Sequence, residues 1–118
     1  GVMIKDNHIA FAGSITKAVT SVKEKLGHMV KVEVETETEE QVREAVAAGA
    51  DIIMFDNRTP DEIREFSKIV PSAIVTEASG GITIEDLPKY GKTGVDYISL
   101  GALTHSVKAL DISFNIEG

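Results

Sequence analysis

Short apolar runs separated by amphipathic stretches recur along the chain. Five runs rich in Val and Ile are predicted to be strands, at residues 2–4, 30–34, 52–55, 73–76 and 97–100. Most of them are continuous rather than alternating, which is typical of parallel strands that helices cover on at least one face. The pattern therefore predicts an α/β fold built on a parallel sheet.

The stretches between these runs carry helix start and stop signals. Ser14, Thr38, Thr59 and Thr83 are favourable N-cap residues, and each stands directly before an amphipathic segment. Alternating strands and helices require right-handed crossovers. A tail at 112–116 alternates apolar and polar residues and is predicted to be a closing edge strand or a short extension. The predicted helices are 15–26, 39–48, 60 to about 69, 84–90, and a last helix near 104–110.

One motif occurs twice. Gly49-Ala50-Asp51 precedes the apolar run at 52–55, and Gly94-Val95-Asp96 precedes the run at 97–100. In both places the pattern indicates a helix that is stopped by Gly and followed by a short buried strand. The recurrence indicates a chain built from βα modules.

The length limits how many modules there are. A complete (β/α)₈ barrel usually takes about 250 residues, whereas 118 residues hold about five units. We therefore predict one unit over residues 1–118, a partial (incomplete) parallel α/β barrel that is TIM-like. Such a partial barrel leaves two unpaired strand edges. The isolated chain is expected to self-associate as a homo-oligomer, a dimer or larger, or else to need a missing partner segment.

Composition excludes several functional classes. The absence of Cys excludes a disulfide framework, a thiolate metal site and a cysteine nucleophile. With 12 basic and 19 acidic residues the formal charge is −7, which argues against nucleic-acid binding. The sequence also shows no apolar run near the ~18 residues that span a bilayer. We expect a soluble, cytoplasmic protein that binds neither nucleic acid nor membrane.

Two acidic residues directly follow neighbouring predicted strands. Parallel α/β proteins collect their functional groups at the carboxyl ends of strands, where Glu35 and Asp56 stand. Paired carboxylates suit Mg²⁺ held together with substrate phosphates, or they stabilise a cationic sugar transition state. The alternative is a solvated acidic rim. Glu33 alternates with Val32 and Val34 and is expected to face another layer.

Glycine-containing turns follow the last two predicted strands. Ser79-Gly80-Gly81 and Gly101 each precede a predicted helix, so backbone N–H groups there can approach an anion. Either turn alone is explained by the need for a tight turn, whereas the adjacent pair favours phosphate binding. His105, at the start of the last predicted helix, either donates to a phosphate or caps the helix. Lys5 suits a substrate carboxylate or phosphate, or pairs with a rim acid.

The chain resembles the quinolinate phosphoribosyltransferase family over nearly its whole length, from residue 3 to about 116. Five motifs carry the resemblance in order, and the Lys-Asp-Asn-His and Gly-Ala-Leu-Thr-His segments are the most specific. They stand at residues 3–10, 32–35, 55–57, 77–82 and 94–106.

The resemblance implies an enzyme of the glycosyltransferase class. It would transfer a phosphoribosyl group from phosphoribosyl pyrophosphate to quinolinate with decarboxylation, giving nicotinate mononucleotide, pyrophosphate and CO₂ in de novo NAD synthesis. Lys5 would contact a quinolinate carboxylate, and Glu35 and Asp56 would act at the ribose and at a Mg²⁺–pyrophosphate. By the same resemblance the 5′-phosphate would be held by Ser79, Gly80, Gly81, Gly101 and His105.

The chain also departs from the family pattern. Family members carry an N-terminal domain and earlier barrel strands whose arginines clamp the dicarboxylate, and only Arg43, Arg58 and Arg64 are present here. The chain is thus expected to be the C-terminal portion of the barrel domain, with little or no turnover alone. The alternatives are a non-catalytic half-barrel fragment that folds or associates as a phosphate-binding module, and another phosphate-binding barrel enzyme with the same rim.

Overall fold

A six-stranded sheet organises the chain in the computed structural model, which describes residues 1–5, 14–101 and 105–110. The sheet order is β1-β2-β3-β4-β5-β6, with β1 to β5 parallel and β6 antiparallel to β5. The strands are β1 (Val2–Ile4), β2 (Val32–Thr36), β3 (Ile52–Asp56), β4 (Val75–Ser79), β5 (Tyr97–Leu100) and β6 (His105–Lys108). The helices are α2 (Ile15–Leu26), α3 (Glu39–Ala48), α4 (Pro60–Ile69), the 3₁₀ helix η1 (Ile84–Asp86) and α5 (Leu87–Tyr90).

The helices begin where the sequence predicts. Thr38 accepts a hydrogen bond from the backbone N–H of Gln41, whose side chain accepts in return from Thr38, so a capping box opens α3. Thr59 and Glu62 form the same box at α4, with Pro60 in the first turn. The backbone and hydroxyl hydrogen bonds with Thr59 hold the pKa of Glu62 below its usual value. These starts are local, because a few neighbouring residues satisfy the first N–H groups of each helix.

The repeated Gly-x-Asp motif has one structural role in both places. Asp51 accepts a hydrogen bond from the backbone N–H of Val32 at 2.8 Å, at the start of β2. Asp96 accepts from the backbone N–H of Thr76 at 2.9 Å, near the start of β4. In each case the Asp backbone N–H donates back to the same neighbouring residue. The motif thus connects the entry of one strand to the strand beside it.

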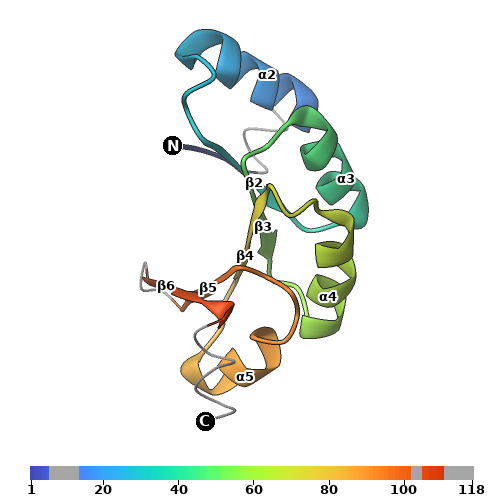
Figure 1. The fold of residues 1–118 in the computed structure, drawn as a ribbon, viewed down its shortest axis with the longest axis vertical. Helices are drawn as coiled ribbons and strands as arrows, with labels where there is room; N and C mark the ends of the chain where they lie inside the picture. Colours follow the sequence, from blue (N-terminus) through green and yellow to red (C-terminus); the bar gives the residue numbers. More distant parts are fainter. Residues whose placement is uncertain (6–13, 102–104, 111–118) are drawn as a thin grey trace.

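The helices cover one face of the sheet, which we call the outer face. Figure 1 shows α2, α3 and α4 side by side along the convex side of a crescent, with the strands on the concave side. Strand β2 shows the consequence, since Val32, Val34 and Thr36 are fully buried and the residues between them are only half-buried. The Thr36 hydroxyl donates to the Met54 carbonyl at 2.8 Å, so its burial leaves no unsatisfied group. The core therefore lies between the outer face and the helices.

Two strands begin two residues later than predicted. The structure places β2 at Val32–Thr36 rather than 30–34, and β4 at Val75–Ser79 rather than 73–76. Before β4 a turn extends the loop, with the Ile74 N–H donating to the Pro71 carbonyl at 3.0 Å. A shift of two residues preserves which side chains face which way, because strands repeat every two residues. The shift does bring later polar residues into the strands.

The predicted helix near 104–110 is wrong over residues 105–108, whereas the last two described residues, 109 and 110, are helical. His105–Lys108 is the antiparallel strand β6, with His105 opposite Leu100 and Val107 opposite Ile98. Val107 packs against the core, so polar and apolar residues alternate with the period of a strand. Pairing with β5 satisfies the backbone and overrides the helical pattern. The predicted tail element at 112–116 lies outside the described residues.

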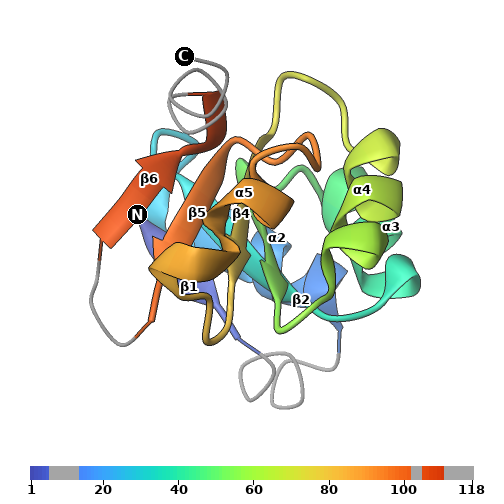
Figure 2. The same ribbon diagram turned by 90° about the horizontal axis from the view of Figure 1, so that it is seen from below.

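Figure 2 shows β5 and β6 as neighbouring arrows. Among the described residues, none of the helices has the length and apolar character needed to cross a bilayer.

Candidate functional site

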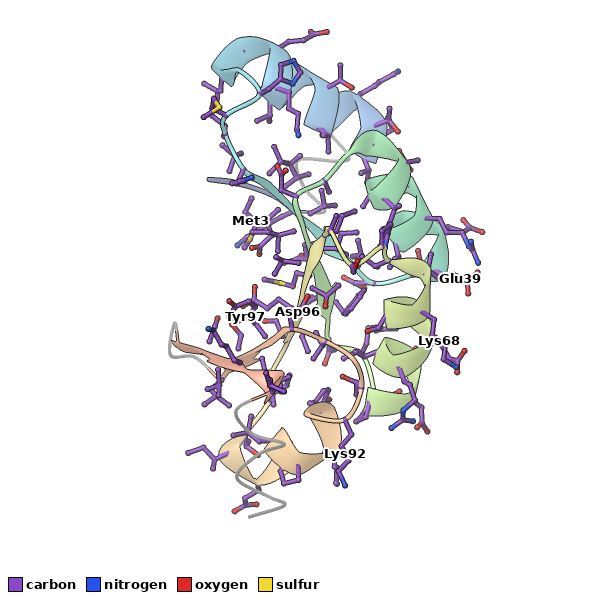
Figure 3. All side chains as sticks on the ribbon, in the orientation of Figure 1. Met3, Glu39, Lys68, Lys92, Asp96 and Tyr97 are labelled. Carbon is purple, nitrogen blue, oxygen red and sulfur yellow. The ribbon has the colours of Figure 1, made fainter. Side chains whose placement is uncertain are left out.

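The concave side of the sheet, which we call the inner face, is unusually rich in carboxylates. Since Val32 and Val34 point to the helices, Glu33 and Glu35 point the other way. Figure 3 shows Met3 and Tyr97 on this inner side and Glu39 and Lys68 on the helical side. By the strand register the inner face consists of Met3, Glu33, Glu35, Ile52, Met54, Asp56, Val75, Glu77, Ser79, Tyr97, Ser99, Ser106 and Lys108.

The parallel register brings four of the predicted site residues to one edge of this face. Asp56 and Ser79 are direct partners at the carboxyl ends of β3 and β4. Glu35 is the partner of Met54 on β3, two residues before Asp56. Lys5 follows Ile4, the partner of Val34, and so stands at the level of Glu35. The roles assigned to these residues remain predictions.

The turn after β4 lies very close to the end of β3. Gly80 has a φ of +104°, and a Cβ there would lie 2.6 Å from the backbone nitrogen of Asn57. Asn57 itself has a φ of +54°, and its N–H donates to the Ser79 carbonyl at 2.8 Å. Only glycine allows this approach. The backbone of the predicted phosphate turn is therefore held against the strand that carries Asp56.

The two predicted glycine turns are neighbours in space. The Gly101 N–H donates to the Ile82 carbonyl at 2.9 Å, which joins the turn after β5 to the turn after β4. The helical segment predicted at 84–90 after the first turn is present as η1 and α5, whereas the strand β6 stands where a helix was predicted after the second turn. His105 begins β6 and not a helix. Any anion binding there must depend on backbone N–H groups and side chains rather than on the dipole of a long helix.

The electrostatics of the inner face centre on Glu33. Partial burial, then repulsion from Glu77 and from Glu35, raise the pKa of Glu33 from 4.5 to about 7. Its Oε2 is buried and lacks a hydrogen-bond partner among the described residues. The expectation that Glu33 faces a different layer from Glu35 is wrong, because the two are two residues apart on one strand and share the inner face.

Sequence reasoning also missed Glu77. Its Oε1 accepts hydrogen bonds from the hydroxyls of Ser99 at 2.9 Å and Ser106 at 2.8 Å. Glu77 was placed beyond the end of its strand because that strand was predicted two residues too early. The available signal was the alternation of Glu77 and Ser79 with Thr76 and Ala78, which are buried on the outer face.

The predicted Mg²⁺ would need oxygen ligands from the side chains of the inner face. The described residues contain no cluster of three or more His, Cys, Asp or Glu side chains able to hold a metal ion. Glu35 and Asp56 are on neighbouring strands and offset by two residues. One or two carboxylates suit Mg²⁺ only when substrate oxygens and water complete the coordination. The residues therefore fit an ion that is held jointly with a phosphate-bearing substrate.

Comparisons with known proteins show which sequences this chain resembles. Residues 1–115 match the family described as "Quinolinate phosphoribosyl transferase, C-terminal domain". The chain is 64% identical over 116 residues to a probable nicotinate-nucleotide pyrophosphorylase (carboxylating) of Bacillus subtilis, covering 98% of this chain and 40% of that protein. A protein of that function from Rattus norvegicus is 41% identical over 118 residues, again with 98% of this chain and 40% of the relative covered.

A solved structure gives the same result. The nicotinate-nucleotide pyrophosphorylase from Francisella tularensis superimposes with a TM-score of 0.82 at 39% identity, covering 92% of this chain and 39% of that chain. The fold of the described residues is thus the fold of part of that enzyme. The chain spans about 40% of the length of the curated relatives that it matches.

Proposed function

We propose a function from one premise: this chain belongs to the quinolinate phosphoribosyl transferase C-terminal domain family. We propose that it forms part of an enzyme that transfers the phosphoribosyl group of phosphoribosyl pyrophosphate to the nitrogen of quinolinate. Decarboxylation then gives nicotinate mononucleotide, with pyrophosphate and CO₂ as the other products, in de novo NAD synthesis. The observation that carries the proposal is the register that aligns Lys5, Glu35, Asp56 and Ser79 at one edge of the inner face.

The acidic residues would act on the ribose. Loss of pyrophosphate leaves an oxocarbenium-like sugar, and carboxylates fixed on a sheet stabilise that developing positive charge without reorganising. Glu35 and Asp56 occupy suitable positions because both lie on the inner face near the strand ends. Lys5 would hold a carboxylate of quinolinate at the same edge.

The glycine turns would orient the donor. Ser79, Gly80, Gly81, Gly101 and His105 would hold its 5′-phosphate, and the Gly101–Ile82 hydrogen bond supports this by joining the two turns. Fixing the phosphate places C1 of the ribose near the acidic residues and the pyridine nitrogen, which lowers the entropic part of the barrier.

Glu35 and Asp56 would also hold Mg²⁺ together with the pyrophosphate of the donor. An ion in that position offsets negative charge on the leaving group. Mg²⁺ is usually held by one or two carboxylates, with substrate oxygens and water completing its coordination, which fits this division.

The rest of the substrate clamp would come from outside these residues. Arg43 and Arg64 form ion pairs on helix surfaces, with Glu39 and Asp61. Arg58, in the loop between β3 and α4, pairs with Glu62 and donates to the Asp56 carbonyl. We therefore propose that the isolated chain turns over little or no substrate. As further parts of the proposal, the protein is cytoplasmic and a homo-oligomer, and the unpaired edges at β1 and β6 among the described strands support association.

A non-catalytic phosphate-binding module is the second candidate, favoured by the hydrogen bond between the two glycine turns. An activity assay distinguishes the enzyme from the phosphate-binding module. We define the hybrid as the Bacillus subtilis relative with its matching segment replaced by this chain. The parent hybrid is expected to convert quinolinate, whereas the 118-residue chain alone is not; binding of donor without conversion by the hybrid would favour the module.

The residue assignments are tested by titrating the hybrid with phosphoribosyl pyrophosphate and Mg²⁺. Asp56→Ala and Ser79→Ala are each expected to weaken donor binding about tenfold or more, because each removes a charged or hydroxyl contact. Glu65→Ala on the exposed side of α4 is the matched control and should bind as the parent does. Unchanged affinity in both test variants would refute the assignment.

A further inference from the structure

A single carboxylate oxygen joins three strands of the sheet. Ser99 on β5 and Ser106 on β6 are register partners, so their hydroxyls lie next to each other on the inner face. Both hydroxyls donate to Oε1 of Glu77 on β4, at 2.9 and 2.8 Å. The side chain of Glu77 thus connects the antiparallel pair β5–β6 to the parallel part of the sheet.

This connection lies where the backbone pairing stops. Strands β4 and β5 pair only at Glu77 with Tyr97 and at Ala78 with Ile98. Ser99 lies beyond that pairing, and β6 contacts the parallel sheet through β5, its register partner. The hydrogen bonds to Glu77 therefore replace the missing backbone pairs at this level of the sheet.

The joined segment leads directly to two residues of the proposed phosphate site. Gly101 is two residues after Ser99, and His105 is the residue before Ser106. The Gly101 N–H donates to the Ile82 carbonyl at 2.9 Å. This bond precedes the connection between β5 and β6, and the Ser106 bond to Glu77 follows it.

We propose that Glu77 is a positioning residue that holds the β5–β6 pair in the place where Gly101 and His105 receive the donor phosphate. The inference rests on the proposed function. Glu77 acts through the two serines, since its Oε1 is already occupied by their hydroxyls. It follows that the acceptor oxygen matters for positioning and the negative charge does not.

Three variants of the hybrid distinguish the role of the acceptor oxygen of Glu77 from that of its negative charge. Glu77→Leu removes the acceptor, Ser99→Ala with Ser106→Ala removes both donors, and Glu77→Gln keeps a carbonyl oxygen that accepts from both serines while removing the charge. We expect the Leu and double Ala variants to raise KM for phosphoribosyl pyrophosphate about tenfold, with kcat and KM for quinolinate within about threefold of the parent. Glu77→Gln should stay close to the parent, and the control Glu65→Leu should equal it.

Other outcomes overturn the proposal. A fall in kcat for Glu77→Gln as large as that for Glu77→Leu would show that the charge acts on the reacting atoms. A parent-like KM for the donor in Glu77→Leu, or an equal rise in KM for both substrates, would show that the serine contacts do not position the phosphate segment.

Amide hydrogen exchange separates this inference from the proposed function. Peptides that span residues 99–108 should exchange at least about tenfold faster in Glu77→Leu than in the parent hybrid, and at the parent rate in Glu77→Gln. If the parent hybrid lacks activity, the proposed function fails, while this exchange pattern still establishes that Glu77 holds the segment. Equal exchange in all variants refutes the positioning role whatever the activity.

Discussion

The same strands form both faces of the sheet, but the outer face is apolar and the inner face is rich in carboxylates. On the outer face Val34, Ile53 and Phe55 are fully buried under the helices. On the inner face Glu33, Glu35 and Glu77 lie close enough that their repulsion contributes to the raised pKa of Glu33. The outer face stabilises the fold through apolar burial, whereas the inner face carries charges that oppose folding. The difference indicates that the outer face, and not the inner face, supplies most of the stability of the fold.

The largest expected difference is in the free energy of unfolding of two variants that shorten neighbouring side chains of β3. Ile53 is fully buried on the outer face, and Ile52 is half-buried on the inner face. Ile53→Ala should lower the free energy of unfolding by about 3–4 kcal/mol, because it removes buried methyl groups and leaves a cavity. Ile52→Ala should cost about 1 kcal/mol. Urea unfolding of the 118-residue chain measures both, and equal losses would contradict the division into two faces.

A smaller loss of stability is expected from a substitution in the turn that follows β4. Gly80→Ala places a Cβ 2.6 Å from the Asn57 nitrogen at a φ of +104°, so we expect a loss of about 2–3 kcal/mol. Gly81→Ala is the matched control, since its φ of +71° is also positive but its Cβ would meet no atom within 4 Å. It should cost about 1 kcal/mol. Thermal unfolding compares the two, and a smaller shift for Gly80→Ala would show that the close approach is not required.

The smallest expected effect is a change of folding stability with pH. The pKa of Glu33 is raised to about 7 in the folded chain against 4.5 in the reference, so the folded state binds this proton more tightly than the unfolded state. The stability that this difference contributes is fully present below pH 4.5 and is lost as the pH rises through about 7. Because the side chain is partly solvated, we expect a loss of about 1–2 kcal/mol.

Glu33→Gln removes this titration. The variant should unfold at a higher temperature than the parent at pH 8, and the difference should shrink at pH 5. Glu24→Gln on the exposed part of α2 is the control and should leave the pH profile unchanged. A parent-like pH profile in Glu33→Gln would mean that Glu33 keeps an ordinary pKa.

The sequence predicted whatever depends on a few adjacent residues. The capping boxes at Thr38 and Thr59 were predicted because side chain and backbone partners lie three residues apart. The stop at Gly49 was predicted because its left-handed backbone favours glycine. The parallel order and the gathering of Lys5, Glu35, Asp56 and Ser79 at one edge also followed, since parallel strands share a carboxyl end. The family resemblance to quinolinate phosphoribosyltransferase was confirmed by the matching family and relatives.

Tertiary structure decided what depends on partners distant in sequence. Residues 105–108 form a strand rather than a helix because β5 offers an edge to pair with. Glu77 accepts two hydrogen bonds because the fold brings Ser99 and Ser106, 22 and 29 residues away, next to it. The pKa of Glu33 depends on burial and on Glu77, a residue of a strand two positions along the sheet. Local patterns encode where elements begin and which face is apolar, whereas register and charge environment arise only when separate strands are brought together.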